Sequence, residues 1–283
     1  MSNVDEVLSL LLKEPKQDGV DFSEYDLNGA NINGASFVYS TFLKSNIDNS
    51  ELTGINFSQA SMGGSSIKKS KITDVDFTGT SLIEVNFEET IFTNCNFKNI
   101  TAENCELTSA KFINCNLRGS NLNHSNLYST SFEGCDLSFS RLMYAYMKQV
   151  EIKNSKMHGT NARGSDLSFS KVEETDLSGS ILKYSDLSSC TFTKVKLSNA
   201  NLIGVNLKDA FCSGVQLDEA NLEGADLTYA NLEGSNLQNS FFLEANLHGT
   251  NFTNANLSDA YLVDANISKA ITKGANLENT ILK

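Results

Sequence analysis

Large apolar residues occupy every fifth position of this chain from Phe22 to Leu282, and the register never slips. Among these 53 positions only four depart from Leu, Phe, Ile, Met or Val, namely Ala102, Ala162, Cys212 and Thr272. A period of five matches neither the 3.6-residue repeat of a helix nor the two-residue repeat of a strand. The chain must therefore turn a corner once in every five residues.

A second inward-facing position lies two residues before each large one, where the side chain is small or β-branched, as at Ala30, Ser40 and Ala220. The position directly before the large residue is mostly Asn, Asp or Ser, and the two after it are mixed polar residues and Gly. We expect these three positions to face solvent. With one Pro and no Trp in 283 residues, the composition also indicates a repeat protein rather than a chain of core segments and loops.

Glycine marks the expected turn. Sixteen of the 18 glycines fall two positions after a large residue, where a turn calls for a positive φ, and Asn94 and Asn199 take the same position. Proline is absent after Pro15, as expected if each coil needs its amide hydrogens to pair with the next coil.

The regular stretch ANLEGADLTYANLEG at 220–234 resembles the pentapeptide repeat family, and the resemblance covers residues 20–283. It implies an all-β fold, a right-handed quadrilateral parallel β-helix in which residues twenty apart stack as neighbours. With four pentapeptides per coil, the solenoid would have about 13 coils and a length of roughly 60 Å at ~4.8 Å per coil. The segment GVDFSEYDLNGA also looks like the start of the cyanobacterial members, some of which regulate cell differentiation through protein contacts.

An N-terminal helix is expected over residues 3–14. Its apolar residues share one face and Pro15 follows soon after; they are Val4, Val7, Leu8, Leu11 and Leu12. We interpret residues 1–19 as a capping helix and lead-in, and residues 20–283 as the repeat β-helix. A helix that binds a membrane or a partner is the alternative.

The chain is acidic, with a net charge of −12 and a pI near 4.7. This charge argues against direct binding to nucleic acid or to an anionic membrane, since both require a positive surface. A basic partner, or a surface that imitates DNA, remains open. Without a signal peptide or an apolar run long enough to cross a bilayer, we expect a cytoplasmic location.

Cysteine and histidine give no sign of chemistry. All six cysteines fall on inward positions, so we expect free, buried thiols, with Cys95, Cys115 and Cys135 stacked in a column. The histidines, His124, His158 and His248, lie on outward positions of different coils without a repeated Ser–His–Asp or paired-carboxylate arrangement. We therefore expect a protein that is not an enzyme, with no catalytic residue, cofactor or metal.

One irregularity on the outward positions predicts a protein interface near the C-terminal end. Exposed apolar patches on proteins commonly mark interfaces, and an uncapped β-edge favours end-to-end pairing. The partner would be a protein of unknown identity or a second copy, forming a homodimer through this end; an inconsequential apolar face is the alternative. The candidate residues are Phe241, Leu243, Tyr261, Val263 and Ile281.

The resulting hypothesis is a non-catalytic scaffold for protein–protein interaction with a regulatory role. The alternative is a DNA-mimicking protector or inhibitor of DNA gyrase or topoisomerase, as in the quinolone-resistance branch of the family. Those members carry loops that project from the coils, whereas no insertion interrupts the 53 units of this chain.

Overall fold

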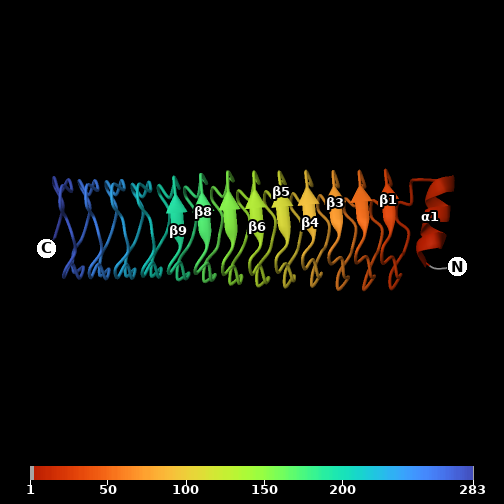
Figure 1. Cartoon of the computed structure of the whole chain (residues 1–283), viewed down its shortest axis with the longest axis horizontal. Helices are drawn as coiled ribbons and strands as arrows, with labels where there is room; N and C mark the ends of the chain where they lie inside the picture. Colours follow the sequence, from red (N-terminus) through yellow and green to blue (C-terminus); the bar gives the residue numbers. More distant parts are fainter. Residues whose placement is uncertain (1–2, 283) are drawn as a thin grey trace. The chain divides into compact units, whose positions relative to one another are not determined.

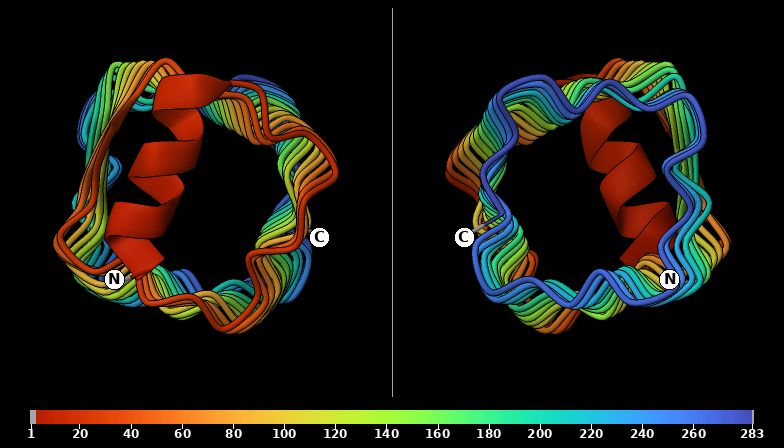
Figure 2. Two further views of the ribbon diagram at one scale, coloured as in Figure 1. Left: turned by 90° about the vertical axis from the view of Figure 1, so that its right-hand side faces the viewer. Right: turned by 90° about the vertical axis from the view of Figure 1, so that its left-hand side faces the viewer.

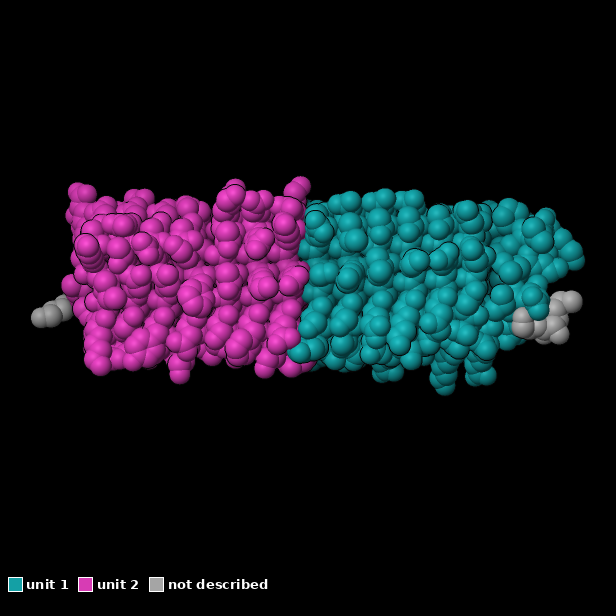
Figure 3. Space-filling model, in the orientation of Figure 1, with its two compact units in different colours: residues 1–141 teal, residues 142–283 magenta. Residues whose placement is uncertain are grey.

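Residues twenty positions apart in the sequence pair side by side in parallel, as Ile32 does with Leu52 and Val172 with Phe192. The computed structural model describes residues 3–282 and is a parallel β-solenoid with four five-residue segments per coil, as the repeat predicts (Figure 1). The chain forms two compact units, which we call unit 1 (residues 1–141) and unit 2 (residues 142–283; Figure 3).

Short strands occupy one side of many coils. Unit 1 contains the helix α1 (Asn3–Lys13) and the strands β1 (Asn31–Asn33), β2 (Glu51–Thr53), β3 (Lys71–Thr73), β4 (Ile91–Thr93), β5 (Lys111–Ile113) and β6 (Ser131–Glu133). Unit 2 contains β7 (Glu151–Lys153), β8 (Lys171–Glu173) and β9 (Thr191–Thr193).

Regular strand structure is less extensive than about 13 coils would suggest. The nine strands begin 20 residues apart, so the region from Asn31 to Thr193 that contains regular strands spans about eight coils. Beyond β9 the coils of unit 2 are joined by single bridges, such as Phe241 to Tyr261. The 20-residue register nevertheless continues to the bridge between Tyr261 and Ile281.

Each five-residue segment ends in a turn whose central residue has a positive φ. In one such turn the backbone N–H of Tyr25 donates to the carbonyl of Phe22 at 3.2 Å, and Glu24 has a φ of 62°. The sequence led us to expect Gly and Asn at this position, but Tyr184 and Phe169 adopt the same conformation. Hydrogen bonds to the neighbouring coils fix the turn, so the conformation persists where the residue type disfavours it.

The interior is filled by the large residues, as predicted. Phe57, Phe77 and Phe97 stack in successive coils of unit 1 with ring centroids 5.5 and 4.8 Å apart. The small inward residues fill the remaining space, and many of their hydroxyls bond to the backbone; for example, Ser45 Oγ donates to the carbonyl of Phe22 at 2.8 Å. The buried hydroxyls of Ser120, Ser140 and Ser180 have no hydrogen-bond partner among the described residues. Burying each large side chain contributes about 1.5–3 kcal/mol.

Helix α1 lies across the open end of the coils that follow it in unit 1 (Figure 2). Val7 is buried, and the side-chain oxygen of Asn3 accepts a hydrogen bond from the Asp26 N–H at 3.0 Å. The prediction that Leu12 shares the buried face was wrong, because this side chain is 89% exposed. Leu12 lies five residues after Val7, about 140° around the helix axis. No helix in residues 3–282 has the length and apolar character needed to cross a membrane.

Candidate protein-interaction site

The predicted interface residues lie together on one side of unit 2. Phe241, Tyr261 and Ile281 occupy the same position in successive coils and are joined by backbone bridges. The N–H of Phe242 donates to the Tyr261 carbonyl, and the N–H of Leu262 to the Ile281 carbonyl, both at 2.7 Å. These bonds fix the three side chains in one column.

Leu243 and Val263 form a second column beside the first. The coils that carry them are joined there by a hydrogen bond of 3.1 Å from the Glu244 N–H to the Val263 carbonyl. Phe241 and Ile281 are 49% and 46% exposed, whereas Tyr261, Leu243 and Val263 are half-buried. We call these five residues the C-terminal apolar patch.

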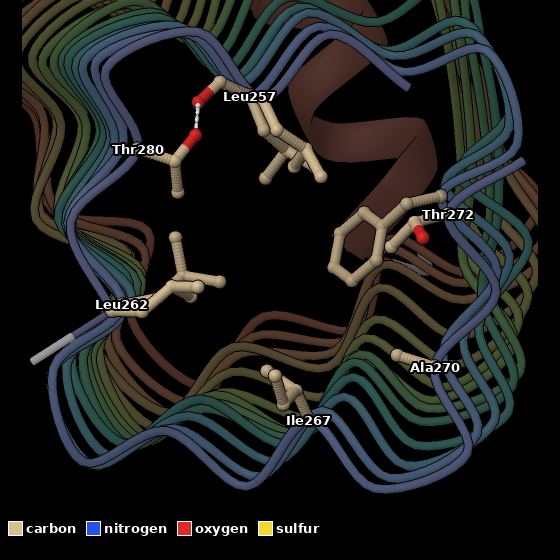
Figure 4. Close-up of a pocket in the computed structure, with 9 residues that line it drawn as sticks. Leu257, Leu262, Ile267, Ala270, Thr272 and Thr280 are labelled. Carbon is tan, nitrogen blue, oxygen red and sulfur yellow. Dashed lines mark hydrogen bonds between the residues drawn. The ribbon is translucent and has the colours of Figure 1, made fainter. Parts of the chain in front are cut away.

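A cavity lies at the end of the described coils of unit 2. A cavity of about 280 Å³ is lined by the inward side chains of residues 252–282, with Leu257, Leu262 and Ile267 pointing into it (Figure 4). In the last coil the core side chains of Ile267 and Leu277 are each 47% exposed, because no further coil covers them within the described residues. Leu282 also lines the cavity and is 53% exposed.

The cysteines are all buried and free, as predicted. Burial raises the pKa of both Cys105 and Cys190 to about 12. Hydrogen bonds with Cys135 and Cys95, together with burial, raise the pKa of Cys115. Because the thiolate is the reactive form of cysteine, Cys105, Cys115 and Cys190 are poor nucleophiles.

The histidines do not come together. His248 has a ring nitrogen 2.8 Å from Ser268 Oγ and meets the Tyr229 ring edge-on at 5.5 Å between centroids. Among residues 3–282, no three His, Cys, Asp or Glu side chains are placed to share a metal ion.

Sequence reasoning missed a set of exposed aromatic side chains at the turns of unit 2. They are Tyr144, Phe169, Tyr184 and Tyr229, each 52–57% exposed. For the three tyrosines a signal exists in the sequence: an aromatic residue at the turn position, with Gly twenty residues later, as in Tyr184 and Gly204. Phe169 lacks this signal, because Ser189 lies twenty residues after it.

A parallel solenoid with a five-residue period defines a class of repeat protein, and comparison with protein families identifies which one. Residues 105–182 match the family described as "Pentapeptide repeat region". Residues 18–54, 26–64, 70–108, 173–209, 185–224, 206–242 and 225–262 match "Pentapeptide repeats (8 copies)". The chain belongs to the pentapeptide repeat family.

Comparison with solved structures finds other pentapeptide repeat proteins. HetL, from the cyanobacterium Nostoc sp. strain PCC 7120, is 18% identical over 100% of this chain and 97% of its own, with a TM-score of 0.42. Rfr23, from the cyanobacterium Cyanothece 51142, is 38% identical over 33% of this chain and 64% of its own, with a TM-score of 0.32.

QnrB1, a plasmid-mediated fluoroquinolone resistance protein, is 20% identical over 77% of this chain and 92% of its own, with a TM-score of 0.26. No curated protein sequence gives a match.

Proposed function

We propose that the protein is a non-catalytic scaffold that binds a protein partner through the C-terminal apolar patch. The observation that carries this proposal is the column of Phe241, Tyr261 and Ile281 on the outside of unit 2, in which Phe241 and Ile281 are about half exposed. Covering this surface with a partner would remove apolar area from water at about 25 cal/mol per Å².

A non-catalytic role is supported by the polarity of the interior. The inward positions carry apolar residues together with Ser, Thr and Cys, and burial raises the pKa of Cys105 and Cys190 to about 12. We also propose a cytoplasmic location, which the six free thiols favour because oxidising compartments promote disulfides.

The test replaces Phe241 and Tyr261 by Glu in the full chain. Two charges at the centre of the patch should abolish partner capture, because an interface cannot bury unpaired carboxylates without a large loss of affinity. If the partner is a second copy, the mass measured by light scattering should fall to that of the monomer.

A matched control replaces Phe211 and Asn231 by Glu. Phe211 is 59% exposed, precedes a core residue as Phe241 does, and is bridged to Asn231 in the next coil. This control adds the same charge to unit 2 and should leave capture and mass unchanged. Equal behaviour of the patch variant and wild type in both assays would rule out the proposal.

A further inference from the structure

Two basic side chains stack in unit 2 of this acidic protein. Arg163 and Lys183 hold the same position in successive coils, which are joined there by a 2.9 Å hydrogen bond from the Gly164 N–H to the Lys183 carbonyl. At a coil spacing of ~4.8 Å, like charges in this arrangement repel each other. Neither side chain forms an ion pair with another residue of the described chain.

At several places the solenoid pairs charges of opposite sign between coils, although like charges also stack, as Asp166 does on Asp186. Lys71 lies 3.3 Å from Glu51, and Lys194 lies 2.7 Å from Glu174, in each case across twenty residues. Three further pairs follow the same rule: Lys68 with Asp48, Lys69 with Glu89, and Lys171 with Glu151. Arg163 and Lys183 are stacked cations outside these ion pairs, and an external anion would relieve their repulsion.

Aromatic rings accompany the cations. The Arg163 guanidinium and the Lys183 ammonium lie 5.7 and 5.6 Å from the centroid of the Tyr184 ring. The Lys148 ammonium lies 5.0 Å from the centroid of the neighbouring Phe169 ring. Cation–π attraction holds the charged groups beside exposed rings. We call Tyr144, Lys148, Arg163, Phe169, Lys183 and Tyr184 the basic aromatic surface.

The tyrosine rings of this surface are held in place by glycine. A Cβ atom added to Gly164 would lie 2.7 Å from the Tyr144 ring, and one added to Gly204 would lie 2.6 Å from the Tyr184 ring. Each ring thus packs directly on the turn of the next coil. Rings that are already positioned lose little conformational entropy when they bind a partner.

Two carboxylates on the segments that follow Arg163 and Lys183 form hydrogen bonds with backbone N–H groups, and neither forms an ion pair with these cations. Asp166 and Asp186 accept hydrogen bonds of 2.9 Å from the N–H groups of Ser168 and Ser188. The side-chain amide of Asn206 also donates to Asp186 at 2.9 Å. Among the described residues, Arg163, Lys183 and Lys148 form no ion pair with these or other carboxylates.

We propose that the basic aromatic surface binds a short acidic segment of a partner protein, in which Asp or Glu side chains alternate with aromatic or apolar ones. Arg and Tyr are the residues that most often dominate the energy of protein interfaces. A nucleic acid fits less well, because three cations on a chain of net charge −12 cannot offset the repulsion of a polyanion. This surface is separate from the C-terminal apolar patch, so the two proposals stand independently.

The test measures fluorescence anisotropy of a short labelled peptide of alternating Glu and Phe, mixed with the full chain. It should bind more tightly than a peptide of alternating Lys and Phe, and its affinity should fall as salt is added. Replacing Arg163 and Lys183 by Glu should weaken binding about ten-fold or more, since both attractions become repulsions. Replacement of both by Gln, which adds no repulsion, should give a smaller loss.

Two matched controls separate the surface from general effects. The control for charge replaces Lys208 and Lys273 of unit 2 by Glu and should retain the wild-type affinity. The control for the ring is Tyr229→Ala, compared with Tyr184→Ala. Tyr229 has nearly the same φ, 58° against 59°, is 56% against 57% exposed, and also packs on a glycine, Gly249. Only Tyr184→Ala should weaken binding.

The results of this peptide-binding test can be distinguished from those of the test of the C-terminal apolar patch. The Phe241→Glu, Tyr261→Glu variant should bind the Glu–Phe peptide like wild type. Equal affinity for the two peptides, or equal loss in the charge control, would overturn the proposal. Tighter binding to a single-stranded oligonucleotide, or to vesicles of anionic lipid, would overturn the assignment to an acidic protein segment.

Discussion

Gly204 and Gly224 occupy the same turn position in successive coils of unit 2, with φ of +62° and +61°, but their surroundings differ. A Cβ at Gly204 would meet Tyr184 ring carbons at 2.6 and 2.8 Å, whereas a Cβ at Gly224 would meet nothing within 4 Å. We predict that Gly204→Ala lowers the free energy of unfolding more than Gly224→Ala. Both substitutions carry about 1–2 kcal/mol of left-handed strain, and only the first must also displace a ring.

Urea denaturation of the two variants measures this difference. The double variant Gly204→Ala, Tyr184→Ala provides the control, since removal of the ring should bring the loss back toward that of Gly224→Ala. Equal unfolding midpoints for the two single variants would show that the Tyr184 ring moves aside without cost.

The buried thiols predict a loss of stability in alkali. The pKa of Cys105 and of Cys190 is raised from 9.0 to about 12 by burial, so the folded protein holds these protons more tightly than the unfolded chain does. Their stabilising effect is complete below pH 9 and is lost as the pH rises toward 12. Each thiol contributes a slope of up to ~1.4 kcal/mol per pH unit in that range.

Urea midpoints in reducing buffer across this range check the effect. The Cys105→Ala and Cys190→Ala variants should start less stable but decline less steeply than wild type. Curves parallel to that of wild type would assign the alkaline loss to other groups.

At the scale of secondary structure, α1 offers a direct test of its capping role. Val7 is 1% exposed beneath the helix, whereas Leu12 of the same helix is 89% exposed. We predict that Val7→Asp lowers the free energy of unfolding by about 2–4 kcal/mol, because it buries a carboxylate against the core. Leu12→Asp should change it by less than about 0.5 kcal/mol.

Thermal unfolding followed by circular dichroism compares the two aspartate variants. Hydrogen exchange adds a spatial readout, because loss of the cap should speed exchange first in the coil that contains Phe22. A Val7→Asp protein as stable as the Leu12→Asp protein would mean that α1 does not cap the solenoid.

The five-residue period allowed most of this structure to be predicted, because it assigns each side chain to the interior or the surface. It placed Phe57 and Phe77 in the core and Phe241 and Tyr261 in one column. It failed where a contact depends on side-chain direction. The burial of Val7 rather than Leu12 follows from how α1 is rotated, and the rings on Gly164 and Gly204 depend on rotamers that a period does not encode.

For the molecule as a whole, the solenoid confines functional groups to its surface. Each coil is filled by eight inward side chains, one large and one small from each of its four five-residue segments, so any specificity must come from the outward positions. Unit 2 carries both the C-terminal apolar patch and the basic aromatic surface, which suit partners of different chemistry. A scaffold that holds two protein segments at once would use this combination.

The distribution of charge over the outward positions argues against the DNA-mimic hypothesis, because a DNA mimic requires a continuous face of negative charge. Cross-coil ion pairs such as Lys71 with Glu51 neutralise stacked carboxylates, and ladders of asparagine amides such as Asn256 and Asn276 replace charge with hydrogen bonds. Arg163 and Lys183 add a positive area to unit 2. Unlike the regular phosphates of DNA, the acidic groups are therefore interrupted on several faces.

We predict that the protein neither inhibits DNA gyrase nor protects it from a fluoroquinolone, because an interrupted negative surface cannot replace DNA in a groove shaped for a regular polyanion. A supercoiling assay with and without the drug measures both effects. The Arg163→Glu, Lys183→Glu variant, which removes the positive area, should be measured in the same assay. Inhibition by wild type would refute the prediction, and stronger inhibition by the variant would show that acidic faces of the solenoid reach the enzyme once the cations are gone.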